Sequence, residues 1–176
     1  AIAPYEGFIA RYMGDGLLVY FGYPHAHEDD AERAVRAGLD IAVAVQQLDV
    51  GTAQSLAVRI GIATGIVVAG DIVGEGAAEE RAVLGETPNL AARLQAIAQA
   101  NAVLLSQSTQ RLVVGRFSLR LLGTQELKGI RDPVSVYQAV AVHAQASRFE
   151  AARRGDLTPL SGRASELSLL TQRWEQ

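Results

Sequence analysis

Three side chains of this sequence have types and spacings that could handle a metal ion or a phosphate group. Asp15 stands between Gly14 and Gly16, and a carboxylate at such a tight turn can approach a hard cation such as Mg²⁺ closely. Asn89 and Arg93 are four residues apart, so they share one face of a helix. An amide and a guanidinium beside a helix N-terminus have the chemistry of a phosphate clamp.

Each of these signals also has a purely structural interpretation. Asp-Gly is a common hairpin turn, so Asp15 taken alone is more often a turn residue than a metal ligand. A polar pair on a helix is more often a solvated face than a binding site. The residues on their own therefore leave both interpretations open.

Other motifs that are often functional favour structural roles here. Gly61–Gly65 and Gly70–Gly74 are rich in glycine, but no Gly-Lys-Ser/Thr follows them, so neither is a P-loop. We interpret these glycines as turn and close-packing residues. His25 and His27 precede an acidic cluster at 28–30, which we interpret as a helix N-terminus rather than a metal site. The chain has no cysteine, which excludes thiolate metal ligands and cysteine nucleophiles.

Turn chemistry and apolar periodicity predict the elements that must position these residues. Phe8–Met13 and Leu17–Phe21 flank an Asp-Gly turn and predict a β-hairpin with the carboxylate at its tip. Apolar residues at helical spacing predict a helix over Asp29–Leu48. Thr87-Pro88 predicts a second helix, with threonine as the cap and proline at the first position. That helix would carry the amide and the guanidinium.

The remaining pattern indicates short strands and helices in mixed order. We expect strands at Leu56–Thr64, Ile66–Ile72, Val103–Leu105, Phe117–Leu122 and Val134–Ala141, an exposed loop at Gly74–Glu80, and helices at Gln107–Val114 and Ser165–Trp174. Adjacent hairpins among helices favour an α+β fold over a doubly wound parallel sheet. The polar segment 147–159 is interpreted as a linker between a domain at 1–146 and the beginning of a second domain at 160–176.

Composition and charge narrow the function classes. The 176 residues are 49% hydrophobic and 20% charged, which is typical of one globular domain with a well-buried core. The net charge of −3 argues against bulk attraction to nucleic acid or to an anionic membrane. No apolar run approaches the ~20 residues that span a bilayer, and the first residues lack the pattern of a signal peptide. We therefore expect a cytoplasmic domain with neither a nucleic-acid nor a membrane partner.

The order of the motifs resembles the class III adenylate/guanylate cyclase family. The matching segments are residues 11–24 (RYMGDGLLVYFGYP), 28–39 (EDDAERAVRAGL), 58–70 (VRIGIATGIVVAG), 84–94 (LGETPNLAARL) and 127–129 (LKG), followed by Tyr137. The resemblance extends over residues 7–141. It implies a ferredoxin-like α+β fold with a central, mostly antiparallel sheet and flanking helices.

In that family the catalytic unit is a dimer with its sites at the interface, and two metal ions lie between two aspartates of one subunit. The resemblance assigns Asp15 to the second metal aspartate, Asn89 to the ribose and Arg93 to the pentavalent phosphate. Lys128 matches a lysine that contacts the terminal phosphates. The implied reaction is attack of the 3′-hydroxyl on the α-phosphate with release of pyrophosphate. We therefore expect an adenylate cyclase, a phosphorus–oxygen lyase that forms cyclic AMP as a homodimer with Mg²⁺ or Mn²⁺ in intracellular signalling.

Three departures from the family pattern bear on this expectation. The first metal aspartate belongs to an opening strand that would precede Ala1, so we expect an N-terminally truncated and impaired chain. Arg11 stands where the family has a base-reading lysine, and Ala82 stands where it has aspartate or threonine. The resemblance implies ATP as the substrate, and these two departures leave GTP as the alternative. The same departures keep open a non-catalytic cyclase-homology module that binds nucleotide, or only dimerises, and regulates an attached domain.

The C-terminal residues carry a second resemblance. Thr158–Leu167 (TPLSGRASEL) is similar to the entry of an ATPase domain that follows such cyclase domains in large bacterial signalling proteins. We therefore expect the parent protein to continue into a C-terminal ATPase domain.

Overall fold

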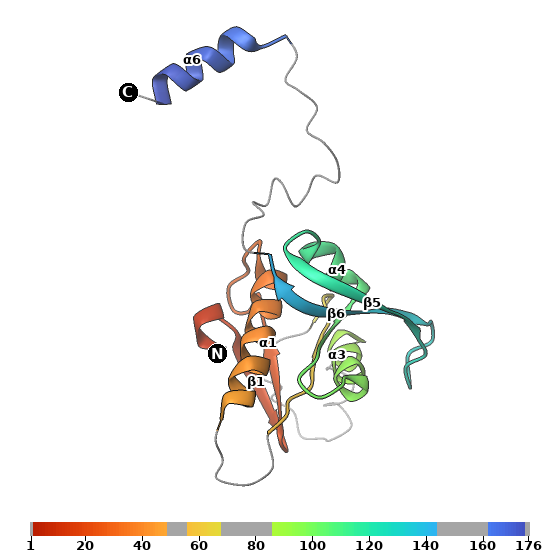
Figure 1. Cartoon of the computed structure of the whole chain (residues 1–176). Coiled ribbons are helices and arrows are strands. Elements are labelled where there is room, and N and C mark those ends of the chain that lie inside the picture. Colours follow the sequence, from red (N-terminus) through yellow and green to blue (C-terminus); the bar gives the residue numbers. More distant parts are fainter. Residues whose placement is uncertain (1, 49–55, 68–85, 144–161, 175–176) are drawn as a thin grey trace.

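The computed structural model of the chain describes residues 2–48, 56–67, 86–143 and 162–174. Its elements in chain order are η1 (Ala3–Tyr5), β1 (Phe8–Met13), β2 (Gly16–Tyr20), α1 (Asp30–Gln47), β3 (Ile60–Ile62), α3 (Glu86–Ile97), β4 (Val103–Ser106), α4 (Gln107–Val113), β5 (Phe117–Gln125), β6 (Val134–Val142) and α6 (Ala164–Trp174) (Figure 1). The predicted first, third and last helices are confirmed as α1, α4 and α6. None of the described helices is both long enough and apolar enough to cross a lipid bilayer.

The central element is a four-stranded sheet with the strand order β3-β4-β6-β5. β3 runs parallel to β4, whereas β4 and β5 both run antiparallel to β6. All four residues of β4 are buried, as expected for a short apolar strand that is covered on both faces. The expected α+β fold, with a mostly antiparallel sheet and flanking helices, is confirmed.

Helices cover both faces of this sheet and form two apolar clusters. Because successive side chains of a strand point to opposite faces, Val103 and Leu105 of β4 pack with α1 and α4, whereas Leu104 packs with α3. The first cluster consists of Val35, Ala42, Val103, Leu105, Val113, Phe117 and Ala139. The second, called here the α3 cluster, consists of Leu94, Ala98, Ala102, Leu104, Leu127 and Val136. α1 and α3 therefore pack against opposite faces of the sheet (Figure 1).

β1 and β2 form the predicted hairpin, which is a separate two-stranded sheet among the described strands. Met13 pairs with Gly16, so Gly14 and Asp15 form the turn. Gly14 has a φ of +62°, a value that glycine adopts without strain in a tight turn. Asp15 therefore lies at the hairpin tip, as predicted.

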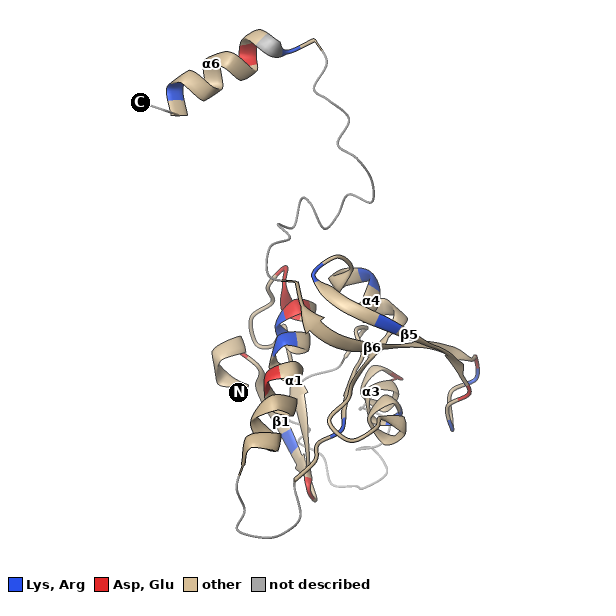
Figure 2. Ribbon diagram, viewed as in Figure 1, with Lys and Arg blue, Asp and Glu red and all other residues tan. Residues whose placement is uncertain are grey.

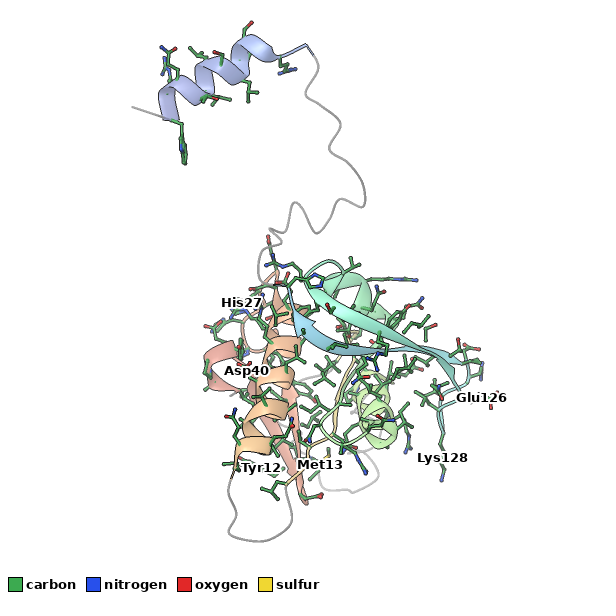
Figure 3. All side chains as sticks on the ribbon, in the orientation of Figure 1. Tyr12, Met13, His27, Asp40, Glu126 and Lys128 are labelled. Atoms are coloured by element: carbon green, nitrogen blue, oxygen red, sulfur yellow. The ribbon has the colours of Figure 1, made fainter. Side chains whose placement is uncertain are left out.

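The acidic cluster before α1 serves the helix N-terminus, as predicted. The Asp30 carboxylate accepts a hydrogen bond from the backbone N–H of His27 at 2.7 Å. Arg33 donates hydrogen bonds to Asp29 and to Glu6. Both bonds raise the pKa of Arg33, and the bond to Asp29 has the larger effect. Acidic and basic residues are therefore interspersed along the first half of α1 (Figure 2). His27 lies close to the beginning of this helix (Figure 3). In the described part of the chain, no three His, Cys, Asp or Glu side chains gather into a metal-binding group.

Two local predictions are wrong. The predicted strand at 56–64 is found as the shorter β3, Ile60–Ile62, which pairs with β4 over these three residues. Of the next predicted strand, the described residues Ile66 and Val67 lie outside any strand. Thr87 lies inside α3 instead of capping it, and its hydroxyl donates to the carbonyl oxygen of Ile66 at 2.9 Å. The predicted residues 68–72, the loop at 74–80 and the linker at 147–159 lie outside the described residues.

The packing of α3 gives a stability prediction. Leu94 is fully buried in the α3 cluster, whereas Ile97 on the same helix is 45% exposed. We expect Leu94→Ala to lower the free energy of unfolding by about 2–5 kcal/mol, because it leaves a cavity between α3 and the sheet. The control Ile97→Ala should lower it by less than about 1 kcal/mol. Urea unfolding followed by circular dichroism measures both, and equal losses would contradict this packing.

Candidate active site

Asp15 is exposed at the tip of the β1–β2 hairpin. The turn is open, since no described residue other than the two chain neighbours of Gly14 has an atom within 4 Å of the position that a Cβ would take there. Within the described ranges, no hydrogen-bond or ion-pair partner holds the Asp15 carboxylate. This carboxylate is therefore accessible to a ligand that arrives from solvent.

α3 presents Asn89 and Arg93 to solvent. At ~100° of rotation per residue, these two side chains lie about 40° apart around the helix axis. Pro88 and Leu94 are the buried residues of the same helix. α3 is thus attached by its apolar residues and leaves an amide and a guanidinium together on its exposed face.

Lys128 is exposed in the connection between β5 and β6. Leu127 is 5% exposed and anchors this connection in the α3 cluster, and its carbonyl oxygen accepts a hydrogen bond from Ile130 at 3.0 Å. The connection lines an open hollow of about 560 Å³, which Glu126 and Arg131 also line. Arg131, three residues after Lys128, is a second cation of this connection, and its spacing from Lys128 is the only sequence signal that indicates it.

One copy of the chain does not bring all the candidate residues together. Figure 3 shows Lys128 at the β5–β6 connection and Met13, which ends β1, apart from it. Arg11 is exposed on β1 and pairs with Leu18 across the hairpin, so it belongs to the same element as Asp15. Ala82 lies outside the described residues.

Residues 10–141 match the family model of the adenylate and guanylate cyclase catalytic domain. The chain belongs to this family. The match covers three quarters of the chain and includes Asp15, Asn89, Arg93 and Lys128. The cyclase domain therefore extends from β1 almost to the end of β6.

Curated relatives and solved structures agree with this assignment. An uncharacterized protein of Rhizobium meliloti (strain 1021) is 36% identical over 177 residues, which are 99% of this chain and 17% of that protein. The chain thus spans less than a fifth of the length of that relative.

Among solved structures, the guanylate cyclase domain of RhGC from Catenaria anguillulae in complex with GTP is 28% identical, with a TM-score of 0.71 over 81% of this chain and 77% of that one. The adenylyl cyclase CyaB from P. aeruginosa is 30% identical, with a TM-score of 0.67 over 83% and 78%. The dimeric guanylyl cyclase domain of the RhoGC fusion protein from Blastocladiella emersonii is 26% identical, with a TM-score of 0.67 over 81% and 76%. These neighbours confirm the cyclase fold and identify a purine nucleotide cyclase domain of the lyase type. They include guanylate cyclases and an adenylyl cyclase.

The cyclase domain offers one described carboxylate that suits a divalent metal ion. Mg²⁺ prefers hard oxygen ligands and is usually bound by one or two carboxylates together with substrate phosphates. Asp15 supplies such an oxygen in open space, so it fits Mg²⁺ or Mn²⁺ as one ligand among several. Among the described residues, no group of three or more His, Cys, Asp or Glu side chains includes it.

If Asp15 serves a ligand rather than the turn, its replacement should leave stability nearly unchanged. We expect Asp15→Asn to change the free energy of unfolding by less than about 0.5 kcal/mol. Gly14→Ala, one residue away, should cost about 1 kcal/mol or more, because an L residue is strained at a φ of +62°. Chemical unfolding of both variants is the measurement. A loss in Asp15→Asn as large as that in Gly14→Ala would show that Asp15 is a turn residue.

Proposed function

We propose that this domain is an adenylate cyclase, which converts ATP to cyclic AMP and pyrophosphate in intracellular signalling. The observation that carries the proposal is the presence of Asp15, Asn89, Arg93 and Lys128 within a single family match over 10–141. All four side chains are exposed, so each can reach a nucleotide from solvent. None of them contributes to the buried core.

The proposed roles follow from the chemistry of each side chain. The 3′-hydroxyl of the substrate attacks its own α-phosphate, and pyrophosphate leaves from the same phosphorus. Arg93 donates to the oxygens that gain charge on the pentavalent phosphate, and Asn89 on the same helix face orients the ribose. Lys128 binds the terminal phosphates, which become the leaving group. Asp15 holds Mg²⁺ or Mn²⁺, which when bound supplies positive charge to the phosphates.

We propose a homodimer in which Asp15 of one copy and Lys128 of the other act on the same nucleotide. Two observations support this arrangement. The two residues belong to separate elements, the β1–β2 hairpin and the β5–β6 connection, and the related guanylyl cyclase domain from Blastocladiella emersonii has been solved as a non-canonical dimer as well as a monomer. Two-fold pairing of identical chains would create two equal sites, each with residues from both copies.

Arg11 and Ala82 are proposed to lie against the purine base. Arg11 can donate N–H groups to ring acceptors, whereas Ala82 has no polar side-chain atom and offers only its backbone. ATP is the proposed substrate and GTP is the alternative, and the related structures include both a guanylate cyclase and an adenylyl cyclase.

The alternative function is a regulatory cyclase-homology module that binds nucleotide or dimerises without catalysis. Arg11 and Ala82, which depart from the family pattern, favour this alternative. In the domain order that we propose, the module would occupy 1–146 and act on an ATPase-like domain that begins at 160–176. Nucleotide binding without a cyclic product would distinguish the module from the enzyme.

The role of Arg93 gives the test of the proposed function. We expect Arg93→Ala to lower kcat about 10²–10³-fold, which is the usual cost of losing one donor to a charged transition state. The measurement is cyclic nucleotide formation by the full-length protein with Mn²⁺, from ATP and from GTP in parallel.

Arg111→Ala is the matched control, because Arg111 is an exposed arginine on the neighbouring helix α4. Its turnover should stay within about twofold of the wild type. Near-normal turnover of Arg93→Ala would remove the proposed role. Tight nucleotide binding by a wild-type protein that forms no product would favour the regulatory module.

A further inference from the structure

α3 contacts β3 backbone to backbone at Gly61. A Cβ built on Gly61 would lie well inside van der Waals contact with the carbonyl oxygen of Ala91 and the nitrogen of Gln95, and 3.0 Å from the Cβ of Leu94. Gly61 is not among the glycines with a positive φ, so close packing rather than backbone conformation requires glycine here. Because the contacted atoms of Ala91 and Gln95 belong to the main chain, no change of rotamer can make room for a larger residue.

A second contact holds the first turn of α3 to the same part of the chain. The Thr87 hydroxyl donates to the carbonyl oxygen of Ile66 at 2.9 Å. Gly65 permits this approach, since a Cβ there would lie 2.5 Å from Thr87 Oγ1. Contacts at Thr87 and at Ala91–Gln95 are about one turn apart, so together they fix both the distance and the tilt of α3 relative to β3.

β3 is held from its other sides, so α3 is the element that must yield. The Ile60 N–H donates to the carbonyl oxygen of Ala102 at 3.1 Å, and β3 pairs in register with β4. On the opposite face, Gly38 of α1 approaches the side chains of Ile60 and Ile62, each 3.5 Å from a Cβ built on Gly38. An added methyl group at Gly61 would therefore push α3 outward by about 1 Å to restore normal contact distances.

Asn89 and Arg93 lie on the face of α3 that points away from β3. Successive residues of an α-helix are rotated by ~100° around the helix axis. The mean direction of Asn89 and Arg93 around this axis is therefore about 180° from that of residues 87, 91 and 95, which face the sheet. Both side chains are exposed. An outward shift of the helix therefore carries both of them by the full displacement.

We propose that Gly61 is a positioning residue for the cyclase reaction. It sets the distance between β3 and α3, and Thr87 sets the tilt, so that Asn89 and Arg93 meet the nucleotide in reactive geometry. This inference rests on the proposed roles of those two side chains. A misplacement of about 1 Å can cost on the order of 10²-fold in rate, which is large enough to measure.

The first experiment compares two glycine-to-alanine changes in the full-length protein. Gly61→Ala should lower kcat about 10²-fold, while KM for ATP changes only a few-fold. Gly38→Ala is the matched control, since it adds the same methyl group against the other face of β3, where it meets only side-chain atoms of Val103, Ile60 and Ile62. Gly38→Ala should leave kcat within about threefold. Equal kcat in the two variants would overturn the proposal.

A double-mutant cycle separates positioning from general damage. If Gly61 acts through Arg93, the cost of Gly61→Ala should largely vanish in an Arg93→Ala background, because coupled residues are not additive. If the two costs in kcat multiply, Gly61 does not act through Arg93 and the proposal is wrong.

A distance measurement tests the displacement without any need for activity. The chain has no cysteine, so spin labels can be placed at Ala92→Cys on α3 and Leu112→Cys on α4, both exposed positions. The distance between labels should change by about 1 Å or more in Gly61→Ala and stay constant in Gly38→Ala. An unchanged distance overturns the positioning role. A changed distance in a protein that forms no cyclic nucleotide overturns the proposed function instead.

Thr87 keeps the proposal testable if Gly61→Ala does not fold. Thr87→Val removes the hydroxyl that bonds to Ile66 and nearly preserves the shape of the side chain, whereas Thr87→Ser retains the hydroxyl. We expect Thr87→Val to lower kcat about tenfold and Thr87→Ser to keep it near the wild-type value. Equal kcat values for the two variants would contradict positioning through this contact.

Discussion

The close approach of α3 to β3 at Gly61 is the constraint on which the rest of this domain depends. It allows Leu94 to reach full burial in the α3 cluster, which ties α3 to β4 and β6. The same cluster includes Leu127, so the connection that carries Lys128 is anchored to the packing beneath α3. One glycine contact therefore influences the placement of Asn89 and Arg93 directly and the support of Lys128 through shared neighbours.

The two faces of the sheet are covered by different helices, and these helices differ in their exposed sides. α1 and α4 cover one face with apolar residues. Glu32 of α1 is buried and accepts a hydrogen bond from Arg116 at 3.1 Å, which joins α1 to the residue before β5. α3 covers the other face and leaves its outer side polar. The hairpin that carries Asp15 is a separate sheet. The residues that we propose for the site thus lie at the hairpin tip, on the outer face of α3 and in the β5–β6 connection, and the core maintains their spacing.

Much of this arrangement could be predicted from the sequence because the signals were local. The glycines beside Asp15, between two apolar runs, indicated the hairpin, although the turn residues are Gly14 and Asp15 rather than the expected Asp-Gly pair. Helical periodicity indicated α1. The prediction that the glycines of 61–65 serve close packing was also correct for Gly61, but their partner could not be predicted, because the contact with α3 joins residues about thirty positions apart. The error at Thr87 had the same origin. A tertiary acceptor, the Ile66 carbonyl, took the hydroxyl that local pattern assigned to a cap.

The family resemblance predicted sites at a dimer interface, and Asp15 and Lys128 belong to separate elements of one copy, so a site shared by two copies is the central proposal. The most direct measurement mixes the full-length Asp15→Asn and Lys128→Ala proteins, under conditions that exchange subunits, and follows cyclic AMP formation from ATP with Mn²⁺. Each variant alone should be inactive. Random pairing should restore about a quarter of the wild-type activity, because half of the dimers are mixed and each mixed dimer has one intact site of two. No recovery, in samples where mixed dimers are shown to form, would contradict a shared cyclase site.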